Sequence, residues 1–192
     1  MRNPHCAARA SVARSVRIPH SAFAEMFELK PISPAGVPAA IQKAERYRLL
    51  GEPKAAESIC LDVLAVEPEN QQASIILLLA ITDQFPDAPH EGERRAREVL
   101  PRLRDEYKRA YYEGIIHERV ANAQLKRGTP GSGEMAYESF RKAMAMYERA
   151  EQLRPPGNDE ALLRWNTCAR ILERSSEQVR PHEEPDYEPS LE

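Results

Sequence analysis

The stretch that decides the fold is residues 37–70, VPAAIQKAERYRLLGEPKAAESICLDVLAVEPEN. Its apolar residues recur every three or four positions, which is the period of an amphipathic helix. We predict a first helix over about 36–50, ended by Gly51, because glycine readily adopts the left-handed conformation that closes a helix. Pro53 suits the first turn of a second helix over about 53–66. This stretch therefore predicts a helical hairpin.

The same period continues along the middle of the chain. No run alternates apolar and polar residues over strand length, and the prolines fall between the periodic stretches. The predicted helix over 70–84 is apolar most of the way round, so we expect it to be covered on two sides, and the predicted helix over 104–127 carries two apolar stripes. Five further helices are predicted, over about 70–84, 90–100, 104–127, 133–153 and 158–174. The fold class is therefore all-α.

A spacing of four, three and five residues that begins at an alanine and ends at a proline occurs twice. It occurs in Ala56, Cys60, Val63 and Pro68, and again in Ala143, Tyr147, Ala150 and Pro155. A small residue at the start of this pattern lets the second helix of a pair approach the first closely, and proline ends the helix. Internal spacing of this kind is typical of stacked helix pairs.

The spacing resembles that of tetratricopeptide repeat proteins. Residues 37–70 form a 34-residue unit whose matching positions are Ala44, Tyr47, Gly51, Ala56, Leu64, Pro68 and Asn70. The resemblance extends over about 37–174 but weakens after the first unit. Pro101 and Pro155 are 54 positions apart, against 33 for Pro68 and Pro101, so about twenty residues are inserted around the fifth helix.

The resemblance implies a short α-solenoid of about three antiparallel helix pairs with a C-terminal capping helix, which binds another protein in its concave groove. Groove residues in this family come from the first helix of each pair. By register they are Ile41, Glu45 and Arg48, then Ile75, Leu79 and Thr82, then Ile115, Glu118 and Asn122. Several are Ile or Leu where family members that bind a terminal carboxylate have basic or amide residues, so we expect an apolar or helical partner segment. Three of them, Ile41, Ile75 and Ile115, have a core role as the alternative.

Charge and composition exclude some classes of protein. The 192 residues carry 27 basic and 30 acidic side chains, a net charge of −3, which disfavours a dedicated nucleic-acid or anionic-membrane binder. The longest apolar run, residues 73–81, is about half the length that a membrane-spanning helix needs. The three cysteines are too few and too scattered for a disulfide framework. A non-membrane protein of a reducing compartment is expected.

One basic segment supports an alternative function. Seven basic residues lie within sixteen positions: Arg94, Arg95, Arg97, Arg102, Arg104, Lys108 and Arg109. Tyrosines that could stack on bases follow closely, so RNA or single-stranded nucleic-acid binding by residues 94–109 is the second interpretation. Acidic residues are interleaved with the basic ones, however, and local ion pairs on a solvated helix surface explain the pattern as well.

No motif predicts catalysis. The loop Gly128–Gly133 has the glycine spacing of a phosphate-binding loop but lacks its lysine, and it follows a helix. His117-Glu118 begins like a zinc-binding helix, yet Ala121 stands where the second histidine belongs. Cys60 and Cys168 lie on apolar stripes, where cysteine usually acts as a small hydrophobic residue. We therefore expect a non-enzymatic protein without cofactor or metal.

The two ends differ in charge from the middle. Residues 1–33 are predicted to be a disordered basic arm, since residues 1–24 contain four arginines and no acid. This arm is an organelle-targeting segment, an over-extended reading frame with the true start at Met26, or an ordinary disordered arm. Residues 175–192 are predicted to be a disordered acidic tail around a helical domain at 34–174. A cytoplasmic location is expected, with an organelle as the alternative.

Overall fold

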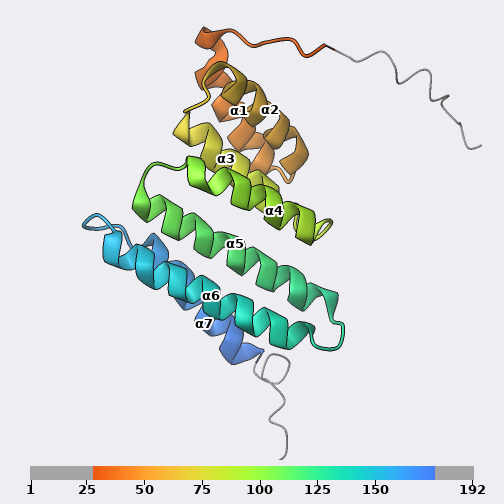
Figure 1. Cartoon of the computed structure of the whole chain (residues 1–192), viewed down its shortest axis with the longest axis vertical. Coiled ribbons are helices and arrows are strands. Elements are labelled where there is room, and N and C mark those ends of the chain that lie inside the picture. The colour runs from red at the N-terminus through yellow and green to blue at the C-terminus, as the bar shows by residue number, and fades with distance from the viewer. Residues whose placement is uncertain (1–27, 176–192) are drawn as a thin grey trace, which may run out of the picture. The chain divides into compact units, whose positions relative to one another are not determined.

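The computed structural model describes residues 28–175, and Figure 1 shows its helices. Residues 28–30 belong to one unit of the chain, and the fold described below is that of the second unit, from Pro31 onward. The predicted basic arm, apart from residues 28–33, lies outside the described residues, as does the predicted tail after Ser175.

Seven α-helices and two short 3₁₀ helices make up the described part of the chain, and residues 28–175 contain no strand. The helices are α1 (Val37–Leu49), α2 (Pro53–Val66), α3 (Gln71–Thr82), α4 (Pro89–Val99), α5 (Glu106–Arg127), α6 (Ser132–Leu153) and α7 (Glu160–Arg174). The 3₁₀ helices are η2 (Pro34–Gly36) and η3 (Leu100–Arg102). Consecutive helices pack as antiparallel pairs (Figure 1). The predicted all-α class is confirmed, and every helix begins and ends within two residues of its predicted position.

The first pair, α1 and α2, is closed by the residues expected from the sequence. Gly51 has a φ of +79°, the left-handed conformation, and Pro53 opens α2. The apolar stripes meet between the two helices, where Ala44, Ala56 and Cys60 are buried. Local signals alone therefore specify this hairpin.

In the second pair, most positions of α3 are buried, whereas α4 buries one stripe of Gly92, Ala96 and Val99. Asn70 caps α3, since its side-chain oxygen accepts a hydrogen bond of 2.9 Å from the Ala73 N–H. The connection to α4 places Phe85 in the core, directly against Gly92. A Cβ atom at Gly92 would lie 2.6 Å from the Phe85 ring, so only glycine allows this contact.

The third pair, α5 and α6, is the longest, with 22 residues in each helix. Gly114 lets α6 approach, because a Cβ atom there would lie 2.5 Å from the Tyr147 ring. In the first pair, 16 positions separate the buried residues Ala44 and Cys60, whereas 33 separate Gly114 and Tyr147. The inserted residues therefore lengthen both helices of the hairpin, and the connection between them stays short.

Two hydrophobic clusters share α5. Ile116 and Ala123 join the cluster built from α1 to α4, while Ile115 and Ala121 join the cluster shared with α6 and α7. The two stripes predicted for this helix are confirmed by this arrangement. No helix in the described part of the chain is long and apolar enough to cross a membrane.

Candidate functional site

The nine residues predicted to line a groove fall into two groups. Glu45 is exposed, and Arg48, Ile75, Leu79 and Asn122 are half-buried. Four others have at most 8% of their surface exposed: Ile41, Thr82, Ile115 and Glu118. These four belong to the core, so they offer almost no surface to a partner.

Three of the four core residues, Ile41, Ile115 and Thr82, lie inside the protein in environments that suit their side chains. Ile41 and Ile115 lie in the first and second hydrophobic clusters, as the core alternative for them proposed. Thr82 donates its hydroxyl to the Leu79 carbonyl at 2.8 Å, which satisfies the hydroxyl inside the protein. Ile75, the third isoleucine of that alternative, is only half-buried and keeps part of its surface.

An ion network joins α1, the end of α3 and α5. Asp83 lies 3.1 Å from Arg48 Nε through Oδ2 and 3.2 Å from an Arg119 guanidinium nitrogen through Oδ1. All three side chains keep between a fifth and about a third of their surface exposed. The Nε atoms of both arginines are buried without a hydrogen-bond partner of good geometry. Two guanidinium groups thus share a single carboxylate.

A second network joins α5, α6 and α7. Glu118 accepts a 2.6 Å hydrogen bond from the Tyr147 hydroxyl and a 3.1 Å bond from Arg164. Burial raises the pKa of Tyr147, and the charge of Glu118 raises it further. Burial alone would lower the pKa of Arg164, but the charge of Glu118, a hydrogen bond with Tyr111 and the charges of Tyr147 and Tyr111 together outweigh burial, and the pKa rises. Glu118 therefore stays satisfied although it is almost fully buried.

Tyrosines of α5 continue the same surface. The Tyr107 and Tyr111 rings stack with centroids 5.9 Å apart, and Tyr112 meets Tyr111 edge to face at 5.1 Å. Burial raises the pKa of Tyr107 and of Tyr112 to about 12. Tyr111 and Tyr112 pack with Leu79 against the second cluster, and the Arg48 charge acts on Tyr112. Neutral aromatic rings therefore lie beside arginines.

We call this surface the odd-helix face, because its side chains come from α1, α3, α5 and α7. It comprises Arg48, Ile75, Leu79, Asp83, Tyr111, Tyr112, Arg119 and Arg164. Of these, the sequence pattern identified Arg48, Ile75 and Leu79. Asp83, Arg119 and Arg164 were missed, since their roles depend on ion pairs between segments that are distant in sequence. The tyrosines were noted, but as part of the basic segment.

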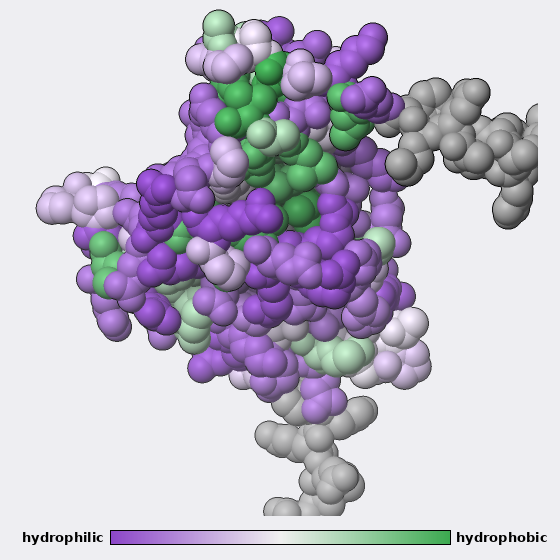
Figure 2. Space-filling model, turned by 45° about the horizontal axis from the view of Figure 1, so that its top comes forward, coloured by the Kyte–Doolittle hydropathy of each residue, from purple (hydrophilic) through white to green (hydrophobic). Residues whose placement is uncertain are grey.

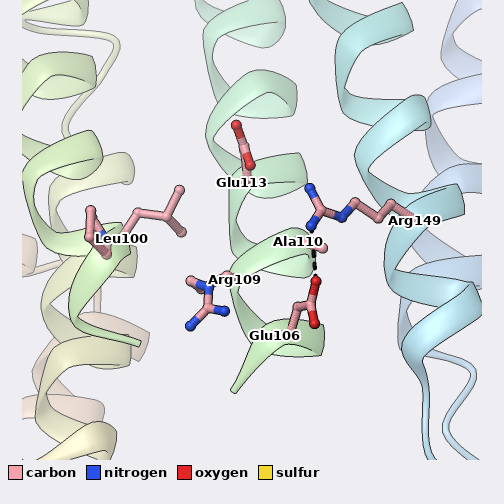
Figure 3. Close-up of a pocket in the computed structure, with 7 residues that line it drawn as sticks. Leu100, Glu106, Arg109, Ala110, Glu113 and Arg149 are labelled. Carbon is pink, nitrogen blue, oxygen red and sulfur yellow. Dashed lines mark hydrogen bonds and ion pairs between the residues drawn. The ribbon is translucent and has the colours of Figure 1, made fainter. Parts of the chain in front are cut away.

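A small pocket lies elsewhere, between η3, α5 and α6, with a volume of about 200 Å³ (Figure 3). Arg149 reaches Glu106 at 3.0 Å across its rim. The Arg109 guanidinium donates to the backbone carbonyls of Leu103 at 2.8 Å and Arg104 at 2.9 Å. The backbone carbonyls thus orient Arg109, and Glu106 holds Arg149.

A third feature is an apolar area at the end of the molecule where α1 and α2 lie (Figure 2). Leu49 and Leu50 at the end of α1 expose 75% and 69% of their surface, and Leu61 of α2 exposes half. Hydrophilic residues cover most of the remaining surface visible in this view. Exposed leucines of this kind are an interaction surface or a solubility liability.

The residues considered for catalysis have environments that do not activate them. Burial raises the pKa of Cys60 and of Cys168 to about 12, so both remain thiols at neutral pH. Burial and the nearby Arg97 lower the pKa of His117 to about 4. No group of three potential metal ligands occurs within residues 28–175. The loop after α5 is an exposed connection.

The basic segment is largely neutralised by ion pairs. Arg94 pairs with Glu91 and Glu98, and Arg97 pairs with Glu93. Two longer-range pairs also form, Arg95 with Glu57 of α2 and Arg104 with Glu69. Charges that are held by carboxylates release few counterions from nucleic acid, so these contacts weaken the case for RNA binding.

Comparison of the chain with family models, with curated proteins and with solved structures finds no match. The resemblance to tetratricopeptide repeat proteins therefore depends on the residues of the chain itself.

Proposed function

We propose that this chain is a non-enzymatic adaptor of tetratricopeptide type, a short α-solenoid that binds an apolar or helical segment of another protein on the odd-helix face. One observation carries the proposal. Half-buried Leu79, Tyr111 and Tyr112 lie beside arginines that are each held in place by a carboxylate. Tyrosine and arginine are enriched among the residues that dominate protein interfaces.

The rigidity of this face also supports the proposal. Ion pairs and buried hydrogen bonds fix the arginines before any partner arrives, so less side-chain entropy is lost on binding. The half-buried apolar side chains of α3 already pack against the core along one side. A partner segment would cover their remaining surface.

Site-specific photo-crosslinking tests the proposal. A photoreactive amino acid at Gln72, which is exposed one turn before Ile75 on α3, is expected to capture a partner from the native host. The matched control is the same amino acid at Ser58, which is exposed on α2 and outside the odd-helix face. Equal capture at both positions, or capture at Ser58 alone, would contradict the assignment of the face.

Nucleic-acid binding remains the alternative function, supported by the basic residues that lack an acidic partner in the described structure, such as Arg102. It would be favoured by an affinity for single-stranded RNA that falls steeply with salt. The half-buried tyrosines, however, lie beside Arg48 and Arg164 and not beside the arginines of α4. Stacking and phosphate contacts would then come from different surfaces.

A further inference from the structure

The odd-helix face contains one carboxylate, that of Asp83, that forms ion pairs with two helices belonging to different helix pairs. Asp83 is the residue directly after α3, and its two oxygens face different partners, Arg48 of α1 and Arg119 of α5. In the described structure α1 packs against α2 and α3, whereas α5 packs mainly against α6. The Asp83 carboxylate therefore links the first pair to the third across the second.

The link between α1 and α5 depends on the single negative charge of Asp83. With Asp83 ionised, two cations share one anion at half-buried positions, where salt screens their interaction less than in open solvent. Without that anion, Arg48 and Arg119 would be left as two like charges on one surface, and the Arg48 Nε atom would lose the carboxylate oxygen that lies 3.1 Å from it. Like charges close together at low exposure repel each other.

We propose that Asp83 is a clasp that sets the spacing of α1 and α5 and so the shape of the odd-helix face. While the clasp is closed, both arginines are drawn toward α3 and the first pair is held against the rest of the domain. A segment that binds across this face and takes over either arginine opens the clasp, so binding and the shape of the face are coupled. The coupling of the clasp to partner binding rests on the proposed function, but the role of Asp83 in the spacing of α1 and α5 does not.

A second ion pair, between Glu118 of α5 and Arg164 of α7, holds α5 to the last helix. Glu118, the residue before Arg119, holds Arg164 of α7 from a nearly buried position. Adjacent residues of α5 thus connect it in opposite directions, to the first pair through Arg119 and to the last helix through Glu118. The first connection lies nearer to solvent than the second, so the first pair is the part that moves when the clasp opens.

Distance measurement between spin labels tests the clasp without any partner. Labels are placed at Gln42 of α1 and Lys126 of α5, both exposed, in the full chain with Cys6→Ser; Cys60 and Cys168 are buried. In the Asp83→Asn variant we expect the mean separation to lengthen by about 1–2 Å, the size of helix shifts in known switches. The matched control is Asp87→Asn, an exposed acid in the same connection, which should leave the distance unchanged.

The result that overturns the proposal is an unchanged distance in Asp83→Asn, even if the melting temperature falls. Should that variant fail to fold, Arg48→Gln keeps the test, because it removes one half of the clasp and leaves the Arg119 pair intact. A smaller lengthening is expected there, because α1 loses its attraction to Asp83 but no second arginine is left to be repelled, and its absence overturns the proposal too. Since neither measurement involves a partner, their failure leaves the proposed function untouched, and failed crosslinking leaves the clasp untouched.

Discussion

The first and third helix pairs perform the same packing task with different residues. α1 and α2 have 13 and 14 residues and meet through Ala44, Ala56 and Cys60, all small and buried. α5 and α6 have 22 residues each and meet through Gly114 and the large ring of Tyr147. The difference teaches that paired helices can pack closely with different combinations of small and large residues.

The polar groups of the two pairs differ as well. The interface of α5 and α6 contains a buried hydroxyl–carboxylate hydrogen bond, Tyr147 to Glu118, which also holds α7. The first pair has no such bond between its two helices among the described residues, and its ionic partners lie on its surface, at Arg48 and Glu57. We therefore expect the third pair to tolerate polar substitutions less than the first.

The largest expected effect tests whether the two pairs are equivalent. Ala56 and Ala143 both start the repeated spacing and are fully buried, so Ala56→Leu and Ala143→Leu should each lower the free energy of unfolding by about 3 kcal/mol through overpacking. Chemical denaturation measures the loss. Lys54→Leu, at an exposed position of α2, is the control and should change it by less than about 0.5 kcal/mol. Similar losses of unfolding free energy in Lys54→Leu and Ala56→Leu would contradict the view that Ala56 marks a close approach of two helices.

The next largest effect is expected only in the third pair, where Gly114 contacts the Tyr147 ring. Gly114→Ala places a Cβ atom 2.5 Å from the buried Tyr147 ring, so the helices must move apart. Alanine also favours the helix over glycine by about 1 kcal/mol, and we expect a net loss of about 2 kcal/mol in thermal unfolding. The double variant Gly114→Ala with Tyr147→Leu should recover part of this loss. No recovery would show that the ring is not the obstacle.

A smaller effect concerns the buried hydroxyl. Tyr147→Phe leaves Glu118 without one hydrogen bond at a buried position, so we expect a loss of about 1.5 kcal/mol in the free energy of unfolding. Tyr47→Phe, a half-buried tyrosine of α1, should be close to neutral. Equal effects of the two substitutions would remove the proposed difference between the pairs.

The smallest effect is pH-dependent and belongs to the third pair. The folded pKa of His117, about 4, lies below its ordinary value of about 6.5, so the folded chain binds this proton less readily than the unfolded chain. Stability from this group is complete above about pH 6.5 and is lost as the pH falls toward 4. Since the ring is only half-buried, among Arg97 and Glu93 of α4 and Lys142 of α6, we expect a loss of about 1 kcal/mol.

Thermal unfolding at several pH values checks this expectation. His117→Gln should flatten the fall in stability between pH 7 and pH 4 relative to the unsubstituted chain, by about the same 1 kcal/mol. The control is His90→Gln, at an exposed position of α4, which should leave the slope unchanged. A variant at His117 with an unaltered slope would show that the folded state accepts this proton as easily as the unfolded one.

The sequence by itself determined the helices and their ends. Periodicity, a left-handed glycine at Gly51 or Gly128 and a proline at the start of α2 are signals that act within a few residues, so they can be recognised without knowing the fold. The two-sided character of α5 could be predicted for the same reason, because each apolar stripe is a property of one helix. The insertion in the third pair was visible as a change of spacing.

Only the tertiary structure decided which residues of α1, α3, α5 and α7 remain exposed to solvent. Thr82, Ile115 and Glu118 share the predicted register with Leu79 and Asn122, yet neighbours from other helices cover the first three and leave the last two partly open. The roles of Asp83 and Arg119 also depend on side chains more than thirty positions away in the sequence. Burial and ion pairing result from how whole helices pack against one another, and the pattern within a single helix does not specify which side chains of other helices will cover it or pair with it.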